Sequence, residues 1–189
     1  MDQVFGSVGR SLATVRNYFL GDEEDNNMSK HIYLRNFIFG VEDSLVSTVG
    51  LLSGVAIAGV PAKTILLTGT VLIFVEAFSM AVGSFLSEHS VDAYLKQGEA
   101  EFRLPIIGGL VMFFSYFVSG FIPLGPYLLT EPAIALKWSI GLSLISLFIL
   151  GIIGAKLSST KLWNGGFRMA MVGGIAIALG VIVGKIIGH

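Results

Sequence analysis

The sequence from Leu104 to Thr130 reads LPIIGGLVMFFSYFVSGFIPLGPYLLT and contains no charged side chain. A helix that crosses the hydrocarbon core of a bilayer needs roughly 20 mostly apolar residues, so this stretch is long enough to span a membrane. Pro123 and Pro126 lie near its end and predict a kinked or broken helix there, because proline lacks the backbone N–H that a helix interior uses. The stretch therefore predicts a transmembrane helix interrupted toward its C-terminal end.

Four further stretches have the same apolar character. The chain has 189 residues, of which 53% are hydrophobic and only 13% charged, with a mean hydropathy of +0.79. Soluble domains are typically about 25% charged. The sequence thus predicts an all-α membrane protein with five transmembrane helices within residues 31–189, joined by short loops that make successive helices antiparallel neighbours. The five predicted spans are about 34–60, 64–88, 104–130, 133–155 and 164–184.

A separate amphipathic helix is predicted before the first span. Apolar residues recur at helical spacing between Val4 and Phe19, and two arginines interrupt the apolar run that a signal peptide would need. We predict that this helix lies in the membrane interface; a cytosolic helix packed on the protein itself is the alternative. The acidic run at residues 22–25 is predicted to be a linker, so that residues 1–30 form one cytosolic region.

Basic residues predict the orientation of the spans. Cytosolic loops of membrane proteins carry an excess of Lys and Arg. Nine of the 12 Lys and Arg residues fall on the side of the predicted N-terminus, which places the N-terminus in the cytosol and the C-terminus outside or in a lumen. A cytoplasmic membrane and a vacuolar membrane both fit this topology. The nine are Arg10, Arg16, Lys30, Arg35, Lys96, Arg103, Lys156, Lys161 and Arg168, against Lys63, Lys137 and Lys185.

Composition and motifs exclude several classes of function. The net charge of −1 gives no reason to expect a nucleic-acid partner. The chain has no cysteine, so disulfides, thiolate metal sites and cysteine nucleophiles are excluded. No Walker, HExxH or GxSxG motif occurs, which argues against an ATPase or an intramembrane protease. The sequence predicts a protein that is not an enzyme and needs no resident cofactor.

Carboxylates inside the predicted spans are the residues that point to chemistry. Glu42 and Asp43 lie in the first span and Glu76 in the second. A carboxylate at bilayer depth costs several kcal/mol and usually faces a cavity or a partner. No Lys or Arg is predicted deep in the spans to neutralise them, since Lys137 lies near a helix end and can extend to the interface. These groups are therefore expected to bind protons, cations or water.

Asp43 and Met80 are predicted to lie level with each other on the first two helices. Each is about 12 Å from the same end of its span, at 1.5 Å per residue, and Glu76 lies one turn deeper on the face of Met80. Both faces are predicted to continue as stripes of small residues, which let transmembrane helices approach closely. A carboxylate oxygen with a thioether suits Mn²⁺ or Fe²⁺ better than Ca²⁺ or Mg²⁺. The stripes comprise Ser47, Gly50 and Gly54 on one helix, and Gly83, Ser84 and Ser87 on the other.

This pattern makes Asp43, Met80 and Glu76 the candidate metal ligands. The structural alternatives are that Met80 only packs and that Glu76 is protonated and structural. Glu42 and Glu76 are candidates for proton exchange. Glu88 and Asp92 share a helical face beyond the second span, where they are either a cytosolic entrance that attracts cations or a solvated helix end.

Three segments resemble motifs of the vacuolar iron transporter family. They read RNFIFGVEDSLV from Arg35 to Val46, leading to LLSG at Leu51–Gly54, AFSMAVGSFLSE from Ala77 to Glu88, and SYFVSGFIPLGPY from Ser115 to Tyr127. The first two are fairly specific, and the resemblance extends from about Leu34 to Gly184.

The resemblance implies a homodimer of five-span subunits with a metal path at the subunit interface. It implies export of Fe²⁺ or Mn²⁺ from the cytosol by proton antiport, and Asp43 and Met80 match the family's transmembrane metal ligands. Iron-transporting relatives often carry a long cytosolic metal-binding domain between spans two and three. Here only about Ser90 to Arg103 fills that place, so the chain resembles a short form without that domain. A non-transporting membrane scaffold and a metal channel are the alternatives.

Overall fold

The structure is a computed structural model that describes the backbone of residues 2–95 and 102–188 and the side chains of residues 29–94 and 102–188. Contacts divide the chain into residues 1–35 and residues 36–189, and each unit is described by itself. The described backbone is helical and contains no strand. The helices are α1 (Asp2–Ile57), α2 (Ala62–Leu95), α3 (Arg103–Leu124), α4 (Pro126–Leu129), α5 (Pro132–Leu157) and α6 (Leu162–Ile187).

Five helical segments are long and apolar enough to cross a membrane, which confirms the predicted fold class. The chain is an integral membrane protein. The observed bounds differ from the predicted ones by a few residues in most places, and the second segment continues beyond Glu88, as the sequence suggested. The segments are Ser29–Ile57, Ala62–Tyr94, Arg103–Leu124, Pro132–Leu157 and Leu162–Ile187.

Helix α1 is continuous from Asp2 to Ile57, so the acidic run at residues 22–25 lies within a helix rather than in a linker. The predicted helix at residues 4–19 is part of this same element. Its amphipathic character and its place in the membrane interface fall outside the described side chains and stay predictions.

The third span ends in the broken helix that its prolines predicted. Helix α3 ends at Leu124, and the short helix α4 begins at Pro126. Between them, the N–H of Gly125 still donates to the carbonyl oxygen of Phe121 at 2.8 Å. Pro126 can begin a helix because the first helical position needs no N–H donor. The Gly125 N–H therefore keeps a helical hydrogen bond at the break.

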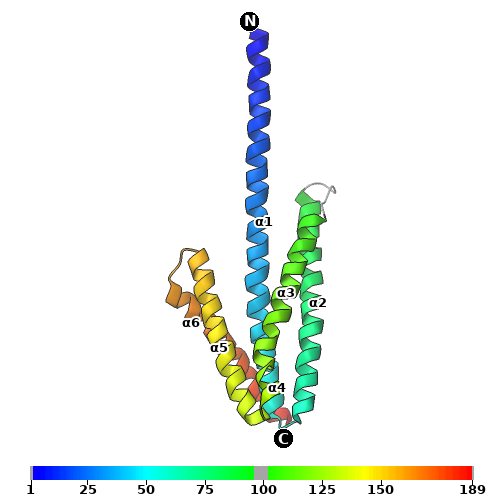
Figure 1. The fold of residues 1–189 in the computed structure, drawn as a ribbon, viewed down its shortest axis with the longest axis vertical. Coiled ribbons are helices and arrows are strands. Elements are labelled where there is room, and N and C mark those ends of the chain that lie inside the picture. Colours follow the sequence, from blue (N-terminus) through cyan, green and yellow to red (C-terminus); the bar gives the residue numbers. More distant parts are fainter. Residues whose placement is uncertain (1, 96–101, 189) are drawn as a thin grey trace. The chain divides into compact units, whose positions relative to one another are not determined.

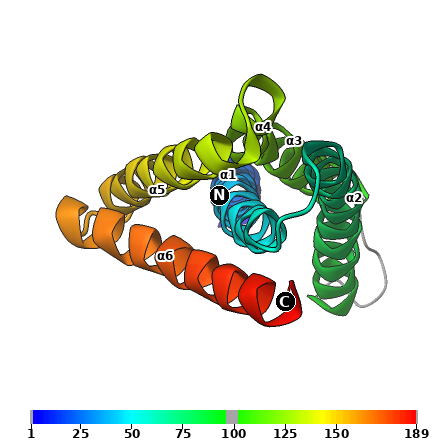
Figure 2. The same cartoon turned by 90° about the horizontal axis from the view of Figure 1, so that it is seen from below.

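The transmembrane helices pack in pairs around the segment Asn36–Ile57 of α1. Helix α2 packs along α3 and α5 packs along α6, and the α1 segment lies between the two pairs (Figures 1 and 2). Two apolar clusters fill these contacts, and both contain residues of α1, so this segment is the centre of the fold. The first cluster has Leu52, Ile65, Ile73, Leu124, Tyr127 and Ala135; the second has Leu45, Leu147, Leu150 and Met169.

Glycines bring α1 and α6 into backbone contact. A methyl group at Gly54 would lie 2.7 Å from the carbonyl oxygen of Gly180, and one at Gly180 or Gly184 would overlap the carbonyl oxygen of Gly50 or Gly54. The small stripe predicted on the first span thus does allow close approach, but its Gly50–Gly54 part meets α6 and not α2. The GxxxG pair Gly180 and Gly184 therefore packs against α1 within the chain.

Candidate functional site

Asn36 fixes how the first two spans align. Its side chain is 1% exposed, and its Nδ2 donates to Ser84 Oγ of α2 at 2.8 Å and to the Gly108 carbonyl oxygen of α3 at 3.1 Å. The same nitrogen lies 3.4 Å from Glu88 Oε1. An amide buried between three helices needs these partners, because a buried donor without one is costly. Asn36 therefore sets the level of α1 against α2 and α3.

This alignment brings Asp43 level with the turn of α2 that contains Glu76 and Met80. Asp43 lies seven residues, or about 10 Å, beyond Asn36 on α1. Because α2 runs antiparallel to α1, the same level on α2 is about seven residues before Ser84 and Glu88, which is the turn from Glu76 to Met80. The Asp43 and Glu76 carboxylates interact electrostatically, as this arrangement requires. All three side chains are half-buried within the chain. The predicted level of Asp43 and Met80 thus agrees with the packing.

Tyr116 of α3 joins the carboxylates and was not singled out from the sequence. Its ring is completely buried, its hydroxyl lies 2.7 Å from Ser47 Oγ, and it interacts electrostatically with Asp43 and Glu76. Ser44 Oγ donates to the Tyr116 carbonyl oxygen at 2.6 Å. Ser47 lies one turn after Asp43, so the tyrosine hydroxyl is held beside the carboxylate pair. A tyrosine in an apolar span gives no sequence signal for this contact.

Arg168 of α6 is a positive charge near one of the carboxylates of the first span, which the sequence did not predict. The sequence analysis counted it with the basic residues on the cytosolic side, and in the structure it lies nearly two turns inside α6, which begins at Leu162. It interacts favourably with the carboxylate of Glu42, which also interacts with Asp43. The expectation that no basic residue reaches these carboxylates is therefore wrong for Glu42.

Two carboxylates and a thioether are the candidate metal ligands that one chain supplies. Among the residues that the structure describes, no group of three or more His, Asp or Glu side chains could hold a metal ion. What the chain brings together is two oxygen donors on different helices, Asp43 and Glu76, with the Met80 thioether one turn from Glu76. Next to Met80 on α2, Gly83 has no neighbouring described atom within 4 Å of where a Cβ would lie. This face of α2 is open.

Comparison with known proteins decides the family. The model of the VIT family matches residues 34–104 and 93–185, which together include most of each of the five spans and the candidate site residues described above. The chain belongs to the VIT family. It is 28% identical to vacuolar iron transporter homolog 2.1 of Arabidopsis thaliana over 88% of this chain and 86% of the relative. It is also 28% identical to vacuolar iron transporter cccA of Arthroderma benhamiae over 50% of this chain and 37% of the relative.

Glu88 and Asp92, the residues suggested for a cytosolic entrance in this VIT family protein, have different surroundings. Glu88 is only 9% exposed, because its carboxylate lies beside Asn36 between the helices. Asp92, one turn further along α2, is half-buried. Glu88 is therefore not part of a solvated helix end. A role of either residue at a cytosolic entrance stays a prediction.

The Asn36 amide is expected to matter for stability in this VIT family protein. Replacing Asn36 with alanine removes the donor shared by α2 and α3, and we expect the free energy of unfolding to fall by about 1–3 kcal/mol. Asn164→Ala, at an exposed position in the first turn of α6, is the matched control and should change stability by less than about 0.5 kcal/mol. Denaturant unfolding in detergent measures both. Equal effects would contradict the role of Asn36.

Proposed function

We propose that this protein exports Fe²⁺ or Mn²⁺ from the cytosol across its membrane in exchange for protons. The relatives that it matches are named vacuolar iron transporter homolog 2.1 and vacuolar iron transporter cccA. The observation that carries the proposal is the pairing of two carboxylates, Asp43 and Glu76, from different transmembrane helices. Ionised groups in a span are costly unless they have a function or a partner. A divalent cation is the partner that would neutralise both.

The donor atoms favour a transition metal as the substrate. Asp43 and Glu76 offer the hard oxygen ligands that suit Mn²⁺ and Fe²⁺, and Met80 adds a softer sulfur that Ca²⁺ and Mg²⁺ would not use. Metal binding to carboxylates releases the protons that those groups otherwise hold. Glu42 has a basic partner in Arg168. Glu76 is therefore the better of the two candidates for exchanging the proton.

A second copy of the chain would complete the metal site. The Met80–Gly83 face of α2 is open, and the most apolar window of this span is 22% buried within the chain, against 50% for the first span. A two-fold interface places the same patch of both subunits against each other. If the α2 faces meet there, each subunit contributes Asp43, Glu76 and Met80 to one path. Homodimerisation is part of the proposal.

The distribution of basic residues supports the proposed direction of transport. Most of the Lys and Arg residues lie in or near the connections that precede the first, third and fifth spans, which would share one side of the membrane because successive spans alternate in direction. This distribution supports a cytosolic N-terminus. Metal would then enter from the cytosol near the starts of the first and third spans, and leave near the break between α3 and α4.

Uptake of Fe²⁺ and Mn²⁺ into proteoliposomes with an acidic interior tests the coupling. We expect uptake by the wild-type protein to depend on the pH gradient. In Glu76→Gln, which cannot exchange a proton at this position, we expect the gradient-dependent part to fall by roughly tenfold or more, as loss of groups around a metal site typically does.

The other outcomes identify the alternatives. Metal flux that ignores the pH gradient in the wild-type protein would favour a channel. Absence of flux for every divalent metal in a correctly folded preparation would favour a membrane scaffold. Glu131→Gln removes a carboxylate at the exposed start of α5, and this control should keep the wild-type response.

A further inference from the structure

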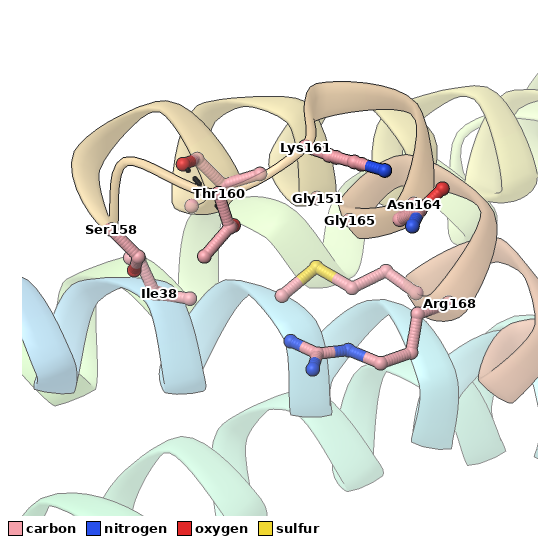
Figure 3. Close-up of a pocket in the computed structure, with 11 residues that line it drawn as sticks. Ile38, Gly151, Ser158, Thr160, Lys161, Asn164, Gly165 and Arg168 are labelled. Carbon is pink, nitrogen blue, oxygen red and sulfur yellow. Dashed lines mark hydrogen bonds between the residues drawn. The ribbon is translucent and has the colours of Figure 1, made fainter.

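A cavity of about 640 Å³ lies where α5 ends and α6 begins. Its walls come from the last two turns of α5, the following loop, the first two turns of α6 and Ile38 of α1. In Figure 3, Lys161, Asn164 and Arg168 lie toward one end of the cavity, and Ile38, Ser158 and Thr160 lie toward the other. None of these residues belongs to the candidate metal site on α2. The cavity is thus a separate feature of the fold.

The cavity is basic. Lys161 and Arg168 line it, and the 11 described lining residues include no Asp or Glu. Asn164 and Ser158 add an amide and a hydroxyl group that can donate hydrogen bonds. Glu42, which interacts with Arg168, is not among the lining residues. A guanidinium has five N–H donors and can serve a ligand while it faces one carboxylate.

Lys161 occupies a position that is unfavourable unless an anion is present. It is the N-cap residue of α6, where no side chain accepts a hydrogen bond from the first-turn N–H groups. Helix N-termini carry partial positive charge, and a lysine there adds to it. Serine, threonine, aspartate and asparagine are preferred at this position because their oxygens accept those hydrogen bonds. An anion in the cavity would face Lys161, Arg168 and the helix end together.

The position of the cavity favours a lipid as the source of the anion. The cavity lies where α5 ends and α6 begins. Helices that cross a bilayer end near the level of the phospholipid headgroups. Beside the polar residues, the wall contains Ile38, Ala155, Met169 and several glycines, which suit the uncharged part of a lipid better than a free ion. We propose that this cavity binds the phosphate group of an acidic phospholipid. Basic pockets between transmembrane helices are suited to such headgroups.

Native mass spectrometry of the intact protein in detergent tests this site. The probes are phosphatidylglycerol and phosphatidylcholine with the same acyl chains, with inorganic phosphate as a competitor. We expect tighter binding of phosphatidylglycerol to the wild-type protein, and about fivefold weaker binding to Lys161→Gln, because one basic residue near a lipid surface contributes about that factor. The double variant Lys161→Gln, Asn164→Ala should lose most of the preference. Lys161 is exposed, so the single variant is expected to fold.

Lys156→Gln is the matched control, because Lys156 is an exposed lysine in the last turn of α5 that does not line the cavity. It should keep the preference for phosphatidylglycerol. Equal loss in Lys156→Gln and Lys161→Gln would overturn the proposal, since it would show general attraction between charges. Equal binding of both lipids to the wild-type protein would also overturn it. Displacement of phosphatidylglycerol by inorganic phosphate at equimolar concentration would show a site for the free ion and overturn the assignment to a lipid.

Discussion

Asp43→Asn is expected to reduce metal transport by about two orders of magnitude or more, because it removes the charge of a proposed ligand while keeping its shape. Loss of groups that merely support a metal ligand costs about 10–100-fold, and loss of a ligand should cost at least as much. The partner carboxylate, Glu76, would remain within a span with one oxygen donor fewer beside it. Initial rates of Fe²⁺ and Mn²⁺ uptake into proteoliposomes with an imposed pH gradient measure the effect.

Folding must be checked in the same preparation. Asp43 is half-buried, so Asp43→Asn should elute like the wild-type protein on size exclusion and unfold at a similar temperature. Asp43→Ala should lose transport as well. Normal uptake by either variant would show that Asp43 is not a ligand. Loss of dimerisation or of folding in Asp43→Asn would instead support the scaffold alternative, in which buried charges hold helices together.

Gly180→Ala is expected to cause the largest loss of stability from a single added methyl group. The new Cβ would overlap the carbonyl oxygen of Gly50, and a backbone group cannot turn aside as a side chain can. Overpacking of this kind costs about 1–3 kcal/mol, occasionally more. We therefore expect the free energy of unfolding to fall by about 2 kcal/mol, with a lower unfolding midpoint in detergent.

Gly174→Ala makes the same change on the same helix in open space. No described atom outside the local helix backbone lies within 4 Å of the Cβ that this substitution adds, so it should be neutral or stabilising. Alanine has the higher helix propensity of the two residues by roughly 0.8–1.0 kcal/mol. The difference between the two variants isolates the contact of α1 with α6. If Gly180→Ala were as stable as Gly174→Ala, the close approach of these helices would be disproved.

Local features of the sequence were enough to predict the spans. Hydropathy and length give the five helices, because each must cross the same hydrocarbon thickness. Pro123 and Pro126 give the break after α3, because the loss of a backbone donor acts where the proline stands. The level of Asp43 against Met80 follows from helix rise and from the antiparallel order of the first two spans. These predictions needed no knowledge of which faces meet.

Contacts between faces could not be predicted in the same way. The glycines of the first span predicted that another helix packs closely against it, but not which one. In the structure that helix is α6 and not α2. The proximity of Arg168 to Glu42 could not be predicted from the sequence, because it depends on how α6 crosses α1. Tyr116 lies beside Asp43 only because Ser44 and Ser47 hold it there.

The backbone contact between α1 and α6 also bears on how the molecule could move. Side chains between helices can change rotamer and let one helix slide past another, but Gly50, Gly54 and Gly180 leave no such layer. Helices α1 and α6 should therefore move together as one rigid body, and Asp43 should move with them. Glu76 is on α2, which contacts α1 through side chains: Asn36 hydrogen-bonds to α2, and Leu52 packs with Ile65 and Ile73. In any cycle that opens the site to alternate sides of the membrane, the separation that can change is thus the one between Asp43 and Glu76, and the affinity for a divalent ion would change with it.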